Sequence, residues 1–167
     1  MNKKAKEYIT KCQLKPHPEG GYYKELYRAT ELILPDHLPK RYRSSRSFST
    51  SIYFLLEGNQ VSTFHRLKSD ELWHFYNGST IIIYTIDGDG ELKTQKLGNN
   101  MKEGESFQVQ IKHNNWFGAE LLDKTSFALI GCTVSPGFEF DDFELGNRNE
   151  LINTYPKLAE IIKKLTR

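Results

Sequence analysis

The chain has few cysteines, little net charge and no long apolar run. Cys12 and Cys132 are the only cysteines among 167 residues, and they lack the C-x-x-C spacing that suggests zinc or redox chemistry. The 23 Lys and Arg against 21 Asp and Glu give a formal charge of +2, too small for the electrostatic footprint of a nucleic-acid binder. No apolar run could span a bilayer, and no apolar segment follows the basic N-terminus as in a secretion signal. We therefore expect a cytoplasmic protein with reduced thiols that binds neither nucleic acid nor membrane.

Aromatic residues, in contrast, are abundant. The 9 Tyr and 10 Phe recur in short segments together with Ile, Thr and Val, a composition typical of strands and of aromatic-lined pockets. The length suits one domain, and no internal repeat or linker divides it. We therefore expect a single β-rich domain over residues 1–167.

The middle of the chain has the pattern of many short strands separated by turns. Turn residues such as Asn77-Gly78 and Asp87-Gly88-Asp89-Gly90 separate the segments. Even spacing of short strands favours an antiparallel sandwich or a closed jelly roll, because closure removes exposed edges. The expected strands lie within residues 47–56, 60–67, 71–76, 79–86, 91–97, 106–111, 115–122 and 126–134.

Helices are expected only at the two ends. Apolar residues recur at helical spacing over residues 3–12, and Pro156 suits the first position of a C-terminal helix. Residues 21–28 read as a first strand, and residues 29–46 as a long surface loop of the kind that often covers a site.

The segment 64–78 holds the densest group of chemically useful side chains. His65 lies on a strand before a turn, and Glu71 lies on the strand after it. Because alternate residues of a strand share one face, both side chains can point into the same interior, whereas His74 points the other way unless a bulge intervenes. Such a cluster suggests a site rather than simple packing.

This segment resembles the first motif of the cupin superfamily. His65, Glu71 and Gly78 stand in the register of that motif, but Leu67 replaces its second histidine. The second motif supplies a further histidine, and Phe117 stands at that position here. Two of the four usual metal ligands are thus missing.

Longer motifs make the resemblance more specific. In order along the chain they are H-P-E-G-G-Y-Y-K-E-L-Y-R, S-T-S-I-Y-F-L-L, F-H-R-L-K-S-D-E-L-W-H-F-Y-N-G and V-S-P-G-F-E-F-D-D-F-E-L-G. Together they look like the small cupin type 5 family of bacteria, fungi and plants. The resemblance implies an all-β, cupin-type double-stranded β-helix, a jelly-roll barrel with short N- and C-terminal helices. It also implies a homodimer and a polar pocket, but no particular reaction. Relatives tend to have Pro-Ala-Gly where this chain has Lys112, His113 and Asn114.

Three functions remain open. In the first, a metal-independent isomerase or epimerase acts on a carbohydrate-like ligand, with His65 as base, Glu71 as its orienting partner, and Tyr53 or Tyr84 as the acid. In the second, a dioxygenase-like enzyme holds a divalent metal (Fe, Mn, Zn or Ni) with His65, Glu71 and a third histidine, His74 or the turn residue His113. In the third, the pocket binds a metabolite without catalysis. The structural alternative is that His65 only hydrogen-bonds within a polar core.

Further residues are expected to contact the small-molecule ligand. The H-P-E-G-G motif suits a tight turn, which explains its glycines better than it explains its His and Glu. Phe138 and Phe140 could form an apolar lid over the pocket, and Trp73 and Trp116 could form flat walls of it. Alternatively, all four could be ordinary core residues. The expected ligand-binding residues are His17, Glu19, Glu25, Trp73, His74, Trp116, Glu120, Phe138 and Phe140.

Overall fold

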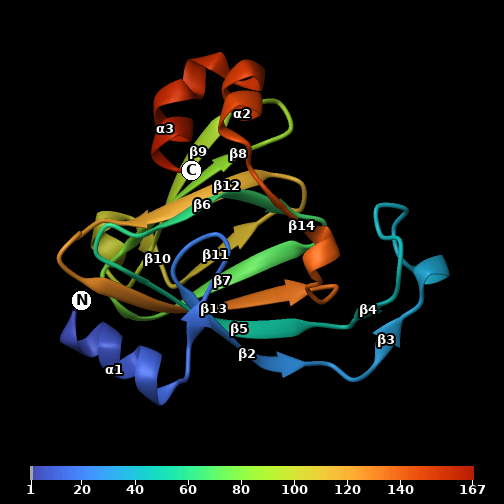
Figure 1. The fold of residues 1–167 in the computed structure, drawn as a ribbon, viewed down its shortest axis with the longest axis horizontal. Helices are drawn as coiled ribbons and strands as arrows, with labels where there is room; N and C mark the ends of the chain where they lie inside the picture. The colour runs from blue at the N-terminus through green and yellow to red at the C-terminus, as the bar shows by residue number, and fades with distance from the viewer. Residues whose placement is uncertain (1) are drawn as a thin grey trace.

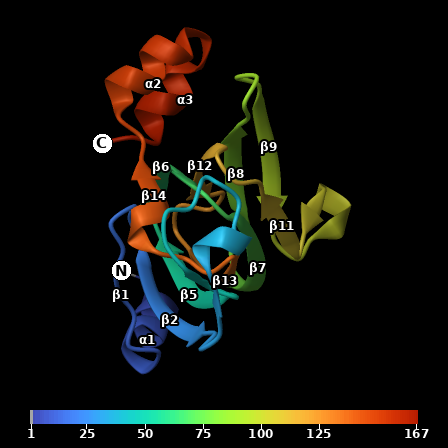
Figure 2. The same cartoon turned by 90° about the vertical axis from the view of Figure 1, so that its right-hand side faces the viewer.

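Two six-stranded sheets face each other and form the body of the molecule (Figures 1 and 2). The computed structural model describes residues 2–167. The first sheet has the order β1-β2-β5-β13-β7-β11, and the second has the order β10-β9-β8-β12-β6-β14. A separate two-stranded sheet pairs β3 with β4.

The strands are short and alternate with turns along the whole chain. Their bounds are β1 Lys15–Pro16, β2 Tyr22–Arg28, β3 Leu32–Ile33, β4 Arg46–Ser47, β5 Thr50–Glu57, β6 Val61–Leu67, β7 Asp70–Gly78, β8 Ile81–Ile86, β9 Leu92–Leu97, β10 Glu105–Ser106, β11 Gln108–Ile111, β12 Trp116–Leu121, β13 Phe127–Ser135 and β14 Phe143–Leu145. The helices are α1 Lys3–Lys11, α2 Arg148–Thr154 and α3 Ala159–Lys164, with short 3-10 turns η1 Pro35–His37, η2 Met101–Glu103, η3 Phe140–Asp142 and η4 Pro156–Leu158. No helix within residues 2–167 is long and apolar enough to cross a membrane.

The order of the strands is that of a jelly roll. From β5 onward the chain passes repeatedly from one sheet to the other, so that β5, β7, β11 and β13 lie in the first sheet and β6, β8, β12 and β14 in the second. Among residues 2–167, every strand pairing except that of β9 with β10 is antiparallel. The expected all-β, cupin-type fold with short terminal helices is confirmed.

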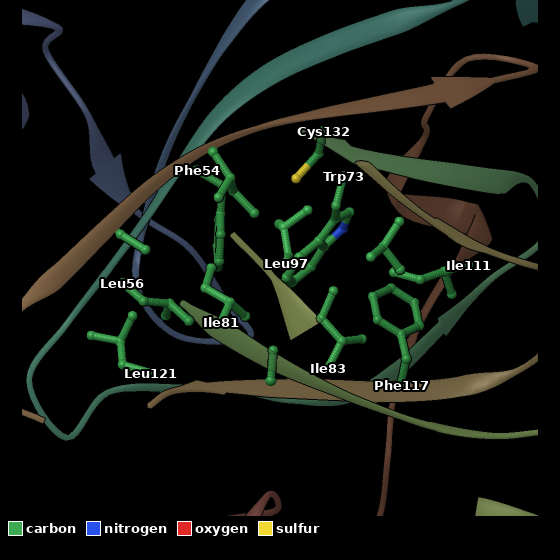
Figure 3. Close-up of a cluster of buried hydrophobic side chains, with 14 of the residues drawn as sticks. Phe54, Leu56, Trp73, Ile81, Ile83, Leu97, Ile111, Phe117, Leu121 and Cys132 are labelled. Atoms are coloured by element: carbon green, nitrogen blue, oxygen red, sulfur yellow. The ribbon is translucent and has the colours of Figure 1, made fainter. Parts of the chain in front are cut away.

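The main core lies between the two sheets (Figure 3). Trp73 lies at its centre, with its ring centroid 5.9 Å from that of Phe54 and 6.1 Å from that of Phe117. These side chains come from β7, β5 and β12, so both sheets contribute. Strand residues here alternate between buried and partly exposed positions, as two-faced sheets require.

Helices cover the outer faces of both sheets. Helix α1 packs on the outside of the first sheet, where Ala5 is buried with Leu55. Helices α2 and α3 pack on the outside of the second sheet, where Ile162 and Leu165 cover Phe64. The sequence predicted α1 and the C-terminal helix but missed α2, which begins after the capping residue Asn147.

Residues 29–46 form an arm rather than a featureless loop. The arm carries β3, η1 and β4 and projects from the side of the body in Figure 1. At its end Arg46 is buried and returns the chain to the first sheet.

Candidate functional site

One cavity opens against the inner face of the first sheet. Its volume is about 290 Å³, at the small end for a ligand pocket. Strands β2, β5, β7 and β13 supply most of the lining, and the segment after β13 supplies the rest. The polar lining residues are His17, Glu25, Arg28, Thr50, Glu71 and Glu139, and the others are Tyr23, Ile52, Cys132, Val134, Phe138 and Phe140.

Glu71 is the most buried carboxylate that faces this cavity. It is 7% exposed and shares the inner face of β7 with Trp73, as the alternation predicted. Burial raises the pKa of Glu71 to about 7, against the opposing effect of the nearby Trp73 indole and Cys132 thiol. Within residues 2–167 its carboxylate forms no ion pair with a base, so hydrogen bonds beyond those of Trp73 and Cys132 would come from water or a ligand.

A second carboxylate, that of Glu19, lies between two imidazoles. Its Oε2 is 3.3 Å from Nδ1 of His17 and 3.2 Å from Nε2 of His65. Its Oε1 accepts a hydrogen bond of 2.8 Å from Ser62 Oγ. Gly20, which follows, has φ +113°, and a Cβ there would lie 2.2 Å from the Val61 carbonyl oxygen. The glycine therefore allows the turn to bring Glu19 against β6.

The hydrogen-bond network assigns the protons of this cluster. His65 Nδ1 lies 2.7 Å from the Thr63 carbonyl oxygen, so Nδ1 donates and Nε2 is left to accept. The Glu19 backbone N–H donates to Nδ1 of His17, which places that ring's proton on Nε2. Two acceptor nitrogens next to Glu19 Oε2 favour a protonated carboxyl group that donates to His65.

Burial favours the uncharged form of Glu19, His65 and His17. It raises the pKa of Glu19 well above its usual value, and the neighbouring Glu71 charge raises it further. Burial lowers the pKa of His65 to about 3 and that of His17 to about 4. The cluster is therefore uncharged near neutral pH, because ionising any member in this enclosed region is costly.

A bulge on β6 explains why His65 and Ser62 share one face. Phe117 of β12 pairs with His65, whereas Ala119 pairs with Ser62, so β6 holds one extra residue between the two pairs. Strict alternation, under which Thr63 and not Ser62 would share the face of His65, does not hold across this bulge. The shift brings the Ser62 hydroxyl to Glu19.

Arg28 joins two acidic residues at the cavity mouth. Its guanidinium donates to both carboxylate oxygens of Glu25, at 3.0 and 2.8 Å, and to Oε1 of Glu139 at 2.6 Å. A register shift on β2 between Glu25 and Tyr27 allows both Glu25 and Arg28 to face the cavity. Tyr27 is exposed as a result, although simple alternation predicted that it shares the Glu25 face.

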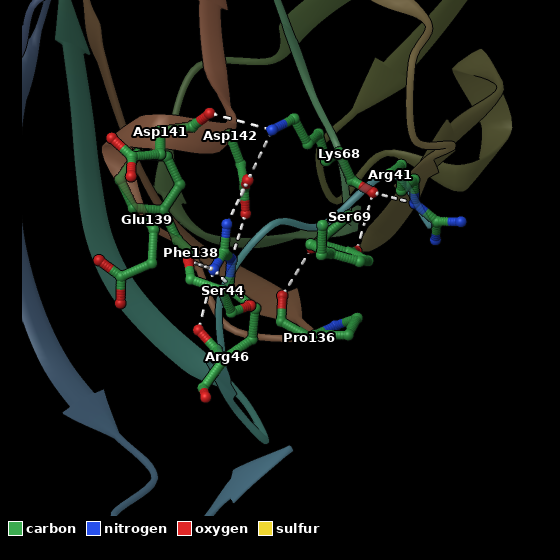
Figure 4. Close-up of polar contacts among 12 residues, drawn as sticks. Arg41, Ser44, Arg46, Lys68, Ser69, Pro136, Phe138, Glu139, Asp141 and Asp142 are labelled. Atoms are coloured by element: carbon green, nitrogen blue, oxygen red, sulfur yellow. Dashed lines mark hydrogen bonds and ion pairs between the residues drawn. The ribbon is translucent and has the colours of Figure 1, made fainter. Parts of the chain in front are cut away.

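The other side of the mouth is held from the arm. Arg46 forms a two-point ion pair with Asp142, with both hydrogen bonds at 2.6 Å, and Lys68 lies 3.2 Å from the same carboxylate (Figure 4). Both Arg46 and Asp142 are buried. Asp142 ends η3, so this ion pair fixes the segment that carries Phe138 and Phe140.

The structure brings some of the expected site residues together and places others elsewhere. Glu71, His17, Glu25, Phe138 and Phe140 line the cavity. Glu19 contacts His17 but does not itself line the cavity. His65 is 2% exposed, does not line the cavity, and contacts Glu19 rather than its expected partner Glu71.

Six further expected residues do not line the cavity. Trp73 is 1% exposed and belongs to the apolar core between the sheets. Tyr53 packs on the outer side of the first sheet, 5.9 Å from Tyr76, and Tyr84 donates a hydrogen bond of 2.9 Å to Glu120 on the outer side of the second. Trp116 belongs to the cluster under the C-terminal helices. His74 points away from Glu71, with its Nε2 3.3 Å from Thr133 Oγ1.

Three residues of the mouth were not predicted. Tyr23 and Arg28 both lie in β2. Tyr23 is two residues before Glu25, and its ring is 4.5 Å from that of His17, whereas Arg28 is three residues after Glu25. Glu139 lies between the two predicted Phe. Tyr23 could have been predicted, because alternation puts it on the same face of the strand as Glu25. Arg28 could not, because the bulge that turns it toward the cavity has no sequence pattern.

The residues present do not fit a cupin-type metal centre. No group of three or more His, Cys, Asp or Glu side chains among residues 2–167 is arranged to hold a metal ion. Both nitrogens of His65 are engaged, by Thr63 and Glu19, and His113 is paired with Asp70 at 2.7 Å. Leu67 and Phe117 occupy the remaining ligand positions of the motif, and both belong to the apolar core.

The two facing sheets, the alternation of the chain between them and the polar cavity beside β7 define a cupin-type jelly roll. Residues 6–146 match the family described as Cupin superfamily (DUF985), and the chain belongs to this family.

Known proteins resemble this chain over most of its length. The structure of protein SO0799 from Shewanella oneidensis superposes with a TM-score of 0.88 at 39% identity, covering 98% of this chain and 97% of that chain. Uncharacterized protein YML079W of Saccharomyces cerevisiae is 30% identical over 148 residues, 81% of this chain and 72% of the yeast protein. Oxalate decarboxylase from Bacillus subtilis matches 90% of this chain and 36% of its own with a TM-score of 0.56, but at 14% identity it shows only a shared fold.

Proposed function

We propose that the cavity binds a small polar, carbohydrate-like compound and that Glu71 and His17 catalyse proton transfer on it, as in an isomerase or epimerase. The observation that supports this most is the convergence of a buried carboxylate, without an ion pair among the described residues, and an imidazole on one small cavity. A carboxyl group whose pKa is raised to about 7 by burial can both accept and return a proton near neutral pH.

In the proposed step, Glu71 removes a proton from a C–H next to a carbonyl group. The C–H electron pair moves into the new C=C bond, and the carbonyl oxygen becomes an enolate oxygen. The Nε2–H of His17 donates a hydrogen bond to that oxygen, which a neutral imidazole can do. Protonated Glu71 then returns the proton to carbon, so no external reactant is consumed.

His65 serves as a positioning residue in this proposal. Its Nε2 accepts from Glu19, and the Glu19 backbone N–H fixes the tautomer of His17. The role given to His65 in the sequence hypothesis, that of the base, therefore passes to Glu71, while His17 supplies the imidazole at the cavity.

The experiment is deuterium exchange in D₂O. We expect the protein to catalyse exchange of the acidic C–H in members of a panel of small hydroxylated aldehydes and ketones, followed by NMR. Glu71→Gln should abolish exchange, while Glu144→Gln, the same change at an exposed carboxylate paired with Arg66, should leave it intact. Exchange that survives Glu71→Gln would contradict the assigned base. Binding without exchange would instead support a non-catalytic metabolite-binding protein.

We also propose a homodimer, the assembly that the cupin resemblance implies. Large apolar side chains are exposed on the arm and beside it, among them Leu32, Leu34 and Phe48. These three residues line one shallow depression, a surface that a second copy of the chain could cover.

A further inference from the structure

The cavity mouth carries more negative than positive charge. Arg28 is the single cation among the lining residues, and it is shared by Glu25 and Glu139. One guanidinium therefore faces two carboxylates, and one negative charge remains uncompensated. Behind the mouth, Arg46 and Lys68 both contact the Asp142 carboxylate, Lys68 also donates to the Asp141 backbone carbonyl, and neither cation lines the cavity.

The lower part of the cavity does not restore the balance. Burial lowers the pKa of His17 to about 4, so this imidazole is neutral near pH 7. Glu71 adds further negative charge whenever it is ionised. An anionic ligand would thus enter a region where every lining cation is already paired, which is unfavourable at short range.

Two phenylalanines that line the cavity are the chain neighbours of Glu139, which lines it too. Glu139 lies between Phe138 and Phe140, whose ring centroids are 5.1 Å apart at an interplanar angle of 80°. Phe140 is 54% exposed, so part of its ring is accessible at the mouth. Only Oε1 of Glu139 bonds to Arg28, which leaves Oε2 for another donor. A carboxylate and phenyl rings that line the same cavity are the groups that recognise organic cations.

A second observation points independently to a ligand. Glu71 is more than nine-tenths buried, faces the cavity and forms no ion pair within the part of the chain that the structure describes. A buried carboxylate without a cationic partner is costly, so a donor from a bound molecule would stabilise it.

We propose that the ligand is a small organic cation whose ammonium group is held at the mouth by Glu139, Phe138 and Phe140 while its uncharged part extends toward Glu71. This inference rests on the proposed function, since it names the substrate class of the same site. The cavity volume of about 290 Å³ limits that class to compact molecules.

The test is a matched set of three probes measured by isothermal titration calorimetry at pH 8. Choline is the cation, 3,3-dimethylbutan-1-ol is its neutral isostere, and 3,3-dimethylbutanoate is an anion of similar shape. We expect choline to bind about tenfold more tightly than the alcohol, and the anion to bind most weakly. Equal or tighter binding of the alcohol or the anion overturns the inference, and so does a lack of binding by all three probes.

Two variants show whether the mouth is responsible. Glu139→Gln should reduce the preference for choline over the alcohol to about twofold, because the ion-pairing oxygen is lost. Phe140→Leu should weaken choline binding but not alcohol binding, because it removes the π face and keeps an apolar side chain. Glu144→Gln is the matched control and should change neither. An unchanged preference in both mouth variants would overturn the inference.

The outcome is separable from that of the proposed function. Deuterium exchange that depends on Glu71 would support proton transfer even if the neutral probe bound best, and only the cation assignment would then fail. Cation-selective binding without exchange on any cationic carbonyl compound would support the ligand class and contradict the proposed catalysis.

Discussion

Glu71 combines deep burial with a position at the cavity surface. Its pKa is raised to about 7, mainly by burial, while an unfolded chain restores the ordinary value near 4.5. The folded protein therefore holds a proton that the unfolded chain releases between these two values. The stabilising effect of this proton is complete below about pH 4.5 and is lost as the pH rises through about 7.

Glu71→Gln should remove this pH dependence. We expect the variant to gain stability relative to the parent as the pH rises from about 4.5 to 7, by a free energy of unfolding on the order of 3 kcal/mol. Urea denaturation at several pH values measures the difference. His17, Glu19 and His65 are present in both proteins, so the difference reports Glu71 together with the effect of its charge on the pKa of Glu19. A constant difference across this range would show that Glu71 titrates normally.

His65→Ala should be destabilising rather than silent. The His65 ring centroid lies 4.0 Å from that of Phe117 and 5.3 Å from that of Phe143, and Glu19 and Thr63 use both ring nitrogens. We expect a loss of about 2–4 kcal/mol, from a cavity and from polar groups left without partners. A melting temperature close to that of the parent would contradict this account and would fit an accessible catalytic base instead.

Among the elements, helix α3 acts as a cover for the outer face of the second sheet. Ile162 and Leu165 are fully buried there, and the Leu165 carbonyl accepts the Phe64 backbone N–H that the β6 bulge leaves outside the ladder. Lys164 pairs with the buried Glu120, which also accepts from Tyr84. These contacts account for Glu120 and Tyr84 without a ligand, and Trp116 packs in the same cluster as Ile162 and Leu165.

Leu165→Ala and Tyr84→Phe test this structural role. We expect Leu165→Ala to reduce the free energy of unfolding by about 2–4 kcal/mol, and Tyr84→Phe to reduce it by about 1 kcal/mol. Both should leave probe affinity at the cavity unchanged, because the second sheet lies between these residues and the cavity lining. Calorimetric titration of the folded variants checks this, and a large affinity loss in Tyr84→Phe would place the phenol at the site after all.

The elements also show what the sequence could predict. Strand alternation correctly placed Glu71 and Trp73 on the inner face of β7, because β7 is regular up to that point. Alternation also put His65 on the inner face, where it is buried against Phe117, but it could not give the contact with Glu19, which lies 46 positions earlier and depends on the β6 bulge. Bulges arise from the pairing of distant strands, so a local pattern cannot reveal them.

At the scale of the whole molecule, the exposed apolar side chains of the arm, Leu32 and Leu34, form a surface that the proposed dimer would bury. If a second copy covers them, light scattering coupled to size-exclusion chromatography should give about twice the 19.4 kDa chain mass. The double variant Leu32→Glu with Leu34→Glu should give the monomer mass, since charge would have to be buried. Lys40→Glu on the same arm is a control for the loss of fold or solubility. A monomeric parent would contradict the proposed dimer.

The Arg46–Asp142 ion pair connects this arm to the rim of the cavity (Figure 4). A displacement of residues 29–46, for example by the docking of another subunit, would therefore also displace η3 and Phe140 at the cavity mouth. Occupancy of the pocket and association through the arm would then influence each other thermodynamically, each strengthening or weakening the other by the same factor.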